Sequence, residues 1–287
     1  MQLRIVAAYA VMCAIWGTTW LAIKVALTGL SPLTGVGVRF TLAAAFLYAV
    51  GAFARQPGGA KPPLKLIVVL ALTLVGGNYA LTYFAETYLA SGLVAVLFGT
   101  LPFFIFALGA VMEREPVSRR ALAGALLALA GVVAISFTGQ GGALIFILAA
   151  LVASALSAFG NVYLKRYAHN DPLRTLPPAM LLSGLTLTVV GAFTTPIDLQ
   201  RALTLPSVSA TLYLAILGSG VTFYLNHWLL QRLSAWIVGL EALIIPVIAV
   251  IVGAVLAHES LGPRELAGAA LVVAGVWIAL CHPERAP

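Results

Sequence analysis

The chain has 287 residues, of which 62% are hydrophobic and only 9% are charged. A soluble protein of this length carries roughly a quarter charged residues, so the composition excludes a soluble enzyme and a disordered chain and predicts an integral protein of the lipid bilayer. The formal charge of +7 does not point to a nucleic-acid partner, because basic residues that flank apolar segments serve to orient them in a membrane.

Apolar runs between turn and charge clusters predict ten spanning helices of about 20 residues each. The runs are continuously apolar, which favours an all-α polytopic bundle over the alternating strands of a barrel. The first run is too long for the apolar part of a signal peptide, so we expect it to be retained. The predicted spans cover residues 5–27, 32–54, 64–85, 91–112, 120–137, 143–164, 176–194, 208–230, 235–257 and 264–281.

Basic residues are distributed unevenly between the predicted loops. If the N-terminus faces the cytoplasm, twelve of the 16 Lys and Arg residues lie in inner segments and two lie in outer loops. Such an excess marks the cytoplasmic side of a membrane. We therefore expect both termini in the cytoplasm, as an even number of spans also requires.

The second half of the chain repeats the first at an offset of 144 residues. Matches at Pro, Glu, Arg and Gly rarely coincide by chance in an apolar sequence. The matched pairs include Pro102 and Pro246, Glu115 and Glu259, Arg120 and Arg264, Gly124 and Gly268, and Gly131 and Gly275. The pattern predicts one membrane domain made of two five-helix repeats, residues 1–138 and 139–287.

Five spans is an odd number, so the second repeat would enter the membrane from the opposite side. Inverted repeats are typical of secondary transporters, which bind substrate near the midplane between the two halves. The repeat therefore predicts a transporter that works by alternating access.

Short motifs in this order resemble the EamA family of the drug/metabolite transporter superfamily. They are Trp16-Gly17 with Lys24, Ser31-Pro32, Arg39-Phe40, the block from Ala90 to Leu93 with Pro102 and Glu113-Arg114-Glu115, and the second copy with His258-Glu259. The resemblance implies ten helices in an inverted repeat and export of a small-molecule substrate across a bacterial inner membrane. This chain departs from the family at Asn161, beside the expected second copy of Trp16-Gly17, and at Glu241, whose repeat partner is Leu97.

Polar residues inside the predicted spans are costly unless they face protein or a water-filled cavity. Asn78 and Thr82 lie four residues apart on the third span, and at the repeat offset they align with Thr222 and Asn226 on the eighth. The matched pairs predict a central cavity that both repeats line. Hydrogen bonds that merely hold the bundle together are the alternative interpretation.

Aromatic side chains accompany these polar groups and suit a partly apolar organic ligand. Trp20 is equally compatible with anchoring at the membrane interface. We expect the substrate, a small amphipathic or aromatic metabolite such as an amino acid, to contact Trp16, Asn78, Tyr79, Thr82, Asn161, Phe223 and Asn226.

Ionisable residues in the spans form an outer and an inner group. Alternating access needs one closure on each side of the site. We predict that Glu86 pairs with Arg39 or Lys24 at the outer closure, and that His227 pairs with Glu241 at the inner one. A buried carboxylate resists ionisation unless a cation is near, so Glu241 is also the predicted carrier of protons as the coupling ion.

Pro102 and Pro246 each fall near the middle of a predicted span. Proline there removes a backbone hydrogen bond and kinks the helix. We expect these matched kinks both to open a vestibule and to shape the bundle.

Motifs for other chemistry are missing from the sequence. It has no clustered metal ligands, no nucleophile elbow and no phosphate-binding glycine loop, so we expect no metal, no cofactor and no catalytic residue. The remaining rival is an intramembrane enzyme that uses Glu241 and His227 as base and acid on a lipid-linked substrate. The inverted repeat favours the transporter.

Overall fold

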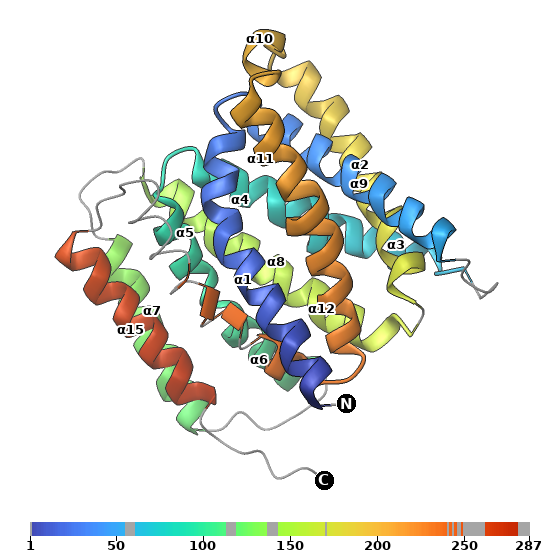
Figure 1. The fold of residues 1–287 in the computed structure, drawn as a ribbon. Coiled ribbons are helices and arrows are strands. Elements are labelled where there is room, and N and C mark those ends of the chain that lie inside the picture. Colours follow the sequence, from blue (N-terminus) through green and yellow to red (C-terminus); the bar gives the residue numbers. More distant parts are fainter. Residues whose placement is uncertain are drawn as a thin grey trace.

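The computed structural model describes residues 2–54, 61–112, 119–136, 143–169, 171–239, 241–242, 244–245, 248 and 262–280, and the regular structure in these ranges is entirely helical (Figure 1). Shorter apolar helices cover Leu93–Gly109 and Leu266–Gly275. The helices long and apolar enough to cross a membrane are Gln2–Ala26, Pro32–Phe53, Leu64–Glu86, Leu144–Tyr167, Pro172–Thr194 and Leu205–Leu230. These findings confirm an all-α polytopic membrane protein.

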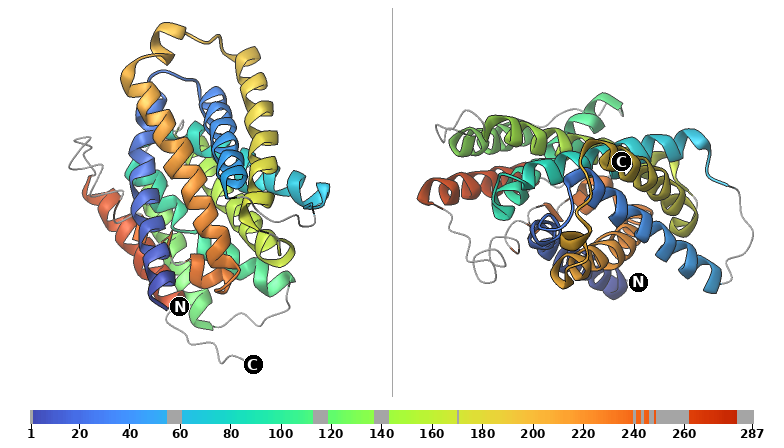
Figure 2. Two further views of the ribbon diagram at one scale, coloured as in Figure 1. Left: turned by 45° about the vertical axis from the view of Figure 1, so that its right-hand side comes forward. Right: turned by 90° about the horizontal axis from the view of Figure 1, so that it is seen from above.

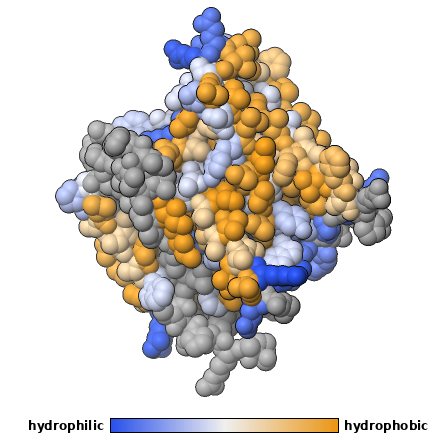
Figure 3. Space-filling view, viewed as in Figure 1, coloured by the Kyte–Doolittle hydropathy of each residue, from blue (hydrophilic) through white to orange (hydrophobic). Residues whose placement is uncertain are grey.

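The outer surface agrees with this assignment. Apolar side chains cover the flanks of α1 (Gln2–Ala26) and α11 (Leu205–Ala215), and hydrophilic ones gather at the short α10 (Leu199–Ala202) (Figure 3). Helix α10 lies at the end of the bundle opposite the start of α1 (Figure 2). The face shown is therefore apolar along these two helices and polar at the α10 end, as a bilayer requires.

The third and eighth predicted spans each contain a π-helical segment. The third consists of α3 (Leu64–Leu70), η1 (Ala71–Gly77) and α4 (Asn78–Glu86). The eighth consists of α11, η2 (Ile216–Val221) and α12 (Thr222–Leu230). Helices α4 and α12 thus begin at residues that align at the repeat offset. π-helical turns are rare in proteins, and those that occur are often at functional sites. Their occurrence at matching positions therefore marks the residues that follow them as candidates for a functional site.

The fourth predicted span is broken into α5 (Ser91–Phe98) and α6 (Leu101–Met112). Pro102 is the second residue of α6, where its missing N–H leaves no helical hydrogen bond unmade. The Thr100 hydroxyl at the break donates to the Leu97 carbonyl (2.7 Å) and lies 3.3 Å from Ser154 Oγ. The expected kink is therefore a break in the helix just before the proline. Pro246 lies outside the described residues.

Helix α9 (Pro172–Thr194) begins four residues earlier than predicted. The Asp171 carboxylate accepts a hydrogen bond from the Leu173 amide (2.8 Å), which caps the helix N-terminus. In the ninth predicted span the structure describes α13 (Ala235–Gly239) and residues 241–242, 244–245 and 248.

Helix α2 (Pro32–Phe53) packs against α9 through small residues. A Cβ atom on Gly37 would lie 2.3 Å from the Thr188 amide nitrogen, and one on Gly184 would lie 2.5 Å from that of Thr41. The Thr41 hydroxyl donates to the Gly37 carbonyl (2.9 Å), and the Thr188 hydroxyl donates to the Gly184 carbonyl (2.8 Å). Each helix thus presents the same Gly-xxx-Thr surface to the other, and the order of the contacts makes the pair antiparallel.

Helices α7 (Arg119–Ser136) and α15 (Pro263–Leu280) form a second such crossing. A Cβ atom on Gly131 would lie 2.7 Å from the Gly268 carbonyl oxygen, and one on Gly275 would lie 2.5 Å from that of Gly124. These four glycines are two pairs aligned at the repeat offset. Their reciprocal contacts have the form that a two-fold axis produces, and the order of the contacts makes this pair antiparallel too.

Candidate functional site

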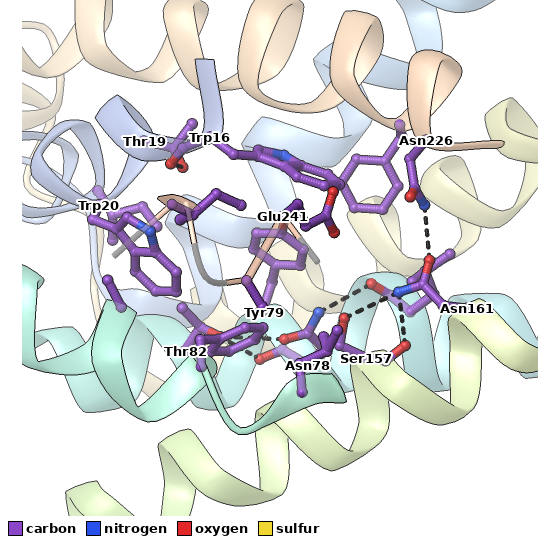
Figure 4. Close-up of a pocket in the computed structure, with 18 residues that line it drawn as sticks. Trp16, Thr19, Trp20, Asn78, Tyr79, Thr82, Ser157, Asn161, Asn226 and Glu241 are labelled. Carbon is purple, nitrogen blue, oxygen red and sulfur yellow. Dashed lines mark hydrogen bonds between the residues drawn. The ribbon is translucent and has the colours of Figure 1, made fainter. Parts of the chain in front are cut away.

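A cavity of about 60 Å³ lies between helices from both halves of the chain. Its walls come from α1, η1, α4, α5, α6, α8 (Ala143–Tyr167) and α12, and from the residues that follow α13. Figure 4 shows the polar and aromatic side chains that point into it. All seven residues of the predicted substrate site line this cavity: Trp16, Asn78, Tyr79, Thr82, Asn161, Phe223 and Asn226.

Side-chain amides form a hydrogen-bonded chain along one wall. Asn226 Nδ2 on α12 donates to Asn161 Oδ1 on α8 (2.8 Å), and Asn161 Nδ2 donates to the Ser157 carbonyl one turn earlier (3.0 Å) (Figure 4). Both asparagines are buried. The residue at which the sequence departs from the family pattern, Asn161, is thus the link between α8 and α12.

Helix α4 satisfies its own polar groups. Asn78 Nδ2 donates to the Leu74 carbonyl in η1 (3.3 Å), and the Thr82 hydroxyl donates to the Asn78 carbonyl (2.9 Å). Both bonds connect residues four apart, so the predicted stripe on this helix is a set of local contacts.

Aromatic rings form the other walls. Trp16 meets Phe223 edge to face with ring centroids 5.9 Å apart, and Tyr79 lies 5.8 Å from Phe223. Trp20 packs against Phe98, with centroids 5.2 Å apart, in the same cavity. Edge-to-face packing leaves ring faces available to an organic ligand.

Glu241 also lines the cavity, and its side chain points between Trp16 and Tyr79 (Figure 4). His227, its predicted partner, lies elsewhere: Nε2 is 3.3 Å from the Ala168 carbonyl and the ring lines a separate cavity with Lys165 and His169. The structure therefore does not bring the two together. Neighbouring residues on a helix point about 100° apart. Because Asn226 faces the cavity, His227, the next residue, faces away from it.

Arg39 is fully buried and bonded to the π-helical segment η2. Its Nε donates to Ser219 Oγ (2.8 Å) and its Nη2 to the Gly218 carbonyl (2.9 Å), which also accepts from Trp16 Nε1 (3.3 Å). The guanidinium carbon lies 4.5 Å from the Tyr79 ring centroid, within cation–π range. Arg39 and Trp16 thus donate to the same backbone carbonyl inside the π-helical segment.

The outer group of ionisable residues is only partly brought together. Lys24 and Glu86 line one cavity of about 460 Å³ at the α10 end, whereas Arg39 is directed to η2. Lys24 and Glu86 thus share a cavity, and the pairing of Glu86 with Lys24 or Arg39 stays a prediction.

Several lining residues escaped the sequence analysis. Thr19, Phe98 and Ser157 line the cavity but were not predicted, and Trp20 was assigned to neither role. Two of them had a usable signal, because Trp20 follows Trp16 and Ser157 precedes Asn161 by one helical turn. Phe98 is the last residue of α5, just before the break in the fourth span.

The profile of the EamA-like transporter family matches the chain twice, over residues 3–137 and 144–281. The chain belongs to the EamA-like transporter family. It is 29% identical, over 92% of its own length and 90% of the relative's, to a protein of Salmonella typhimurium named "Probable amino-acid metabolite efflux pump". It is also 29% identical to the Escherichia coli inner membrane transporter YedA, over 93% of this chain and 87% of that one.

A chain of known crystal structure shares the fold, with a TM-score of 0.73, 19% identity and 98% of each chain covered. Family and relatives together identify a membrane transporter and not an enzyme. The intramembrane enzyme considered above has no support from them.

Proposed function

We propose that this EamA-like transporter exports a small amphipathic or aromatic metabolite, such as an amino acid, by alternating access around the central cavity. The observation that carries the proposal is the convergence of the seven predicted residues, from four different helices, on one cavity. A few buried polar groups set among aromatic rings are typical of sites for organic ligands. The name of the Salmonella relative, an amino-acid metabolite efflux pump, supports the substrate class.

The alternating-access part of the proposal rests on an inverted repeat of ten helices, residues 1–138 and 139–287. It is supported by the antiparallel packing of the aligned helices α7 and α15 and by the matched positions of η1 and η2. We place both termini in the cytoplasm, with the chain in a bacterial inner membrane. Single cysteines at positions 59 and 141, which lie outside the described residues, should then be labelled from the cytoplasm and from outside respectively. The reverse labelling would contradict the orientation.

The cavity is too small for such a substrate in the conformation described. Its 60 Å³ holds a few water molecules, whereas ligand sites typically measure about 300–1,000 Å³. Transport therefore requires the walls to separate, in turn, towards each side of the membrane. We assign Lys24 and Glu86 to the outer closure, with Arg39 holding η2 beneath it. His227, bonded at the Ala168 carbonyl, belongs to the inner closure.

Glu241 is the proposed carrier of a coupling proton. It is buried in the cavity, and an ionisable residue inside a membrane span is a candidate for a proton relay. Proton uptake and release at this residue would connect the substrate site with the proton gradient.

Filling the cavity tests the proposed function. Phe223→Trp adds volume at a cavity wall, and we expect transport in proteoliposomes preloaded with amino acids and amphipathic metabolites to fall about tenfold or more. Phe193→Trp is the matched control, since it makes the same substitution on a ring that is 88% exposed on α9. Equal transport by wild type and Phe223→Trp would show that substrate does not pass through this cavity.

A further inference from the structure

We propose that the cavity holds its substrate by an ammonium group placed at Glu241 and Asn226, so that the substrates are small aromatic or amphipathic amines without a net negative charge. This inference rests on the proposed function and names the chemical class of its ligand. It follows from which hydrogen-bonding groups in the cavity are already used and which are left over.

The amide chain on α8 and α12 determines how Asn226 is oriented. The Ser157 carbonyl can only accept a hydrogen bond, so the atom of Asn161 that faces it must be the amide nitrogen. Asn161 then presents its oxygen to Asn226, whose nitrogen donates to it. Asn226 Oδ1 remains, a buried acceptor with no hydrogen-bond partner among the described residues. The Ser157 carbonyl thus fixes the orientation of both amides, so that this wall offers the ligand the Asn226 Oδ1 acceptor.

Most of the other donors in the cavity are committed to backbone carbonyls. Asn78 Nδ2 donates to Leu74, the Thr82 hydroxyl to Asn78, and Trp16 Nε1 to Gly218. The Thr82 hydroxyl and Trp16 Nε1 carry one hydrogen each and cannot bind a ligand's oxygen without giving up these bonds, whereas Asn78 Nδ2 carries a second hydrogen. The polar wall therefore offers the unpartnered acceptor Asn226 Oδ1, while most of its donors already make a hydrogen bond within the protein.

Glu241 adds charge to this arrangement. Its side chain points into the cavity, and Oε2 is buried without a hydrogen-bond partner among the described residues (Figure 4). The lining residues that the structure describes include neither Lys nor Arg. Arg39 lies behind the Tyr79 ring and uses its donors on η2 and Tyr83. An ammonium group would supply both the positive charge and the donors that these two acceptors lack.

The aromatic walls fit the same ligand. A cation is attracted to the faces of aromatic rings, most strongly to Trp, and Trp16, Tyr79 and Phe223 surround the carboxylate side of the cavity. An anionic substrate would meet these acceptors without a Lys or Arg among the described lining residues. Trp20 Nε1, a neutral donor without a partner among the described residues, suits a carbonyl or hydroxyl oxygen elsewhere on the ligand.

Binding of matched ligand pairs to the purified protein tests the inference. Each pair contains an amine and its N-acetyl derivative, from aromatic and aliphatic amino-acid amides and from simple arylalkylamines, and affinity is measured by calorimetry in detergent. We expect the amine of a pair to bind about tenfold or more tightly than its acetylated partner, and amino-acid amides to bind more tightly than the free amino acids. Acetylated compounds that bind as well as the amines, or free acids that bind better than the amides, would overturn the inference.

Variants separate this inference from the proposed function. Glu241→Gln should reduce amine affinity about tenfold or more and leave the acetylated compounds unchanged, whereas Glu241→Asp should retain the preference for amines. Asp198→Asn, which neutralises an exposed carboxylate near α10, should leave the preference as it is. Glu241→Gln protein that still prefers amines, while Phe223→Trp abolishes binding, would leave the cavity as the substrate site and remove the ammonium site. Failure of every pair to bind wild-type protein would contradict both.

Discussion

The two glycine crossings and the walls of the central cavity are built from the same duplicated sequence but treat it differently. At the α7–α15 crossing, Gly131 meets Gly268 and Gly275 meets Gly124, so that aligned residues make equivalent contacts. In the cavity the equivalence is lost. Thr82, which aligns with Asn226, bonds within its own helix, whereas Asn226 bonds across to α8.

The two π-helical segments repeat this contrast. The Ala71 carbonyl in η1 accepts one neutral hydrogen bond, from Ser183 Oγ on α9 (2.8 Å). The Gly218 carbonyl in η2 accepts from a buried guanidinium and from an indole. Residues that the two halves share thus build the scaffold, and residues that only one half carries connect the central cavity to it. Four predictions test this division.

The largest effect is expected at the symmetric crossing. Gly131→Leu and Gly275→Leu each force a side chain into backbone atoms that a Cβ would already approach within 2.7 Å, and both should lose about 3 kcal/mol or more of stability. Gly109→Leu is the control, because a Cβ there meets no described atom within 4 Å. Yield and melting temperature in detergent measure the effect. A large difference between the two crossing variants would refute their equivalence.

Removing the side chains that bond to the two π-helical segments should cost unequal amounts of stability. Arg39→Met removes the donors to Ser219 and Gly218 and should cost about 1–3 kcal/mol, with loss of transport. Ser183→Ala removes a single neutral bond to η1 and should cost about 1 kcal/mol. Thermal denaturation and proteoliposome flux report the two effects. Equal losses in both variants would show that the segments are held alike.

Substitutions of the cavity asparagines in the two halves should also differ in their effect on transport. Asn226→Leu leaves Asn161 Oδ1 without its donor and should reduce transport about tenfold, whereas Asn78→Leu removes only a local bond and should reduce it a few fold. Both proteins should insert and fold, as size-exclusion profiles will show. Unchanged transport in both variants would mean that these amides only hold the bundle together.

The smallest effect is expected on the exchange activity of Glu241→Gln when substrate is saturating. Exchange between equally loaded compartments should continue, because it needs no net proton movement, while uphill export driven by a proton gradient should fail. The two assays use the same proteoliposomes, so each controls the other. Uphill export at the wild-type rate would exclude Glu241 as the proton carrier.

Much of the candidate site was predictable because helical spacing is local. Asn78 and Thr82, four residues apart, had to share a face, and the repeat offset extended that inference to Asn226. The assignment of Glu241 to a gate with His227 rested on depth alone. Depth along a helix does not specify which way a side chain points relative to its neighbours, and the structure directs these two residues to different cavities.

The sequence by itself determined that this is an α-helical membrane protein, that its halves are related, and which residue types occupy the membrane interior. Composition and periodicity suffice for that, since the bilayer admits few structures. Only the tertiary structure decided that Arg39 donates to η2, that the span near Pro102 is broken, and that Glu241 faces the cavity. Those outcomes depend on which backbone carbonyls lack helical partners and which side chains from other helices can reach them, and no local pattern contains that information.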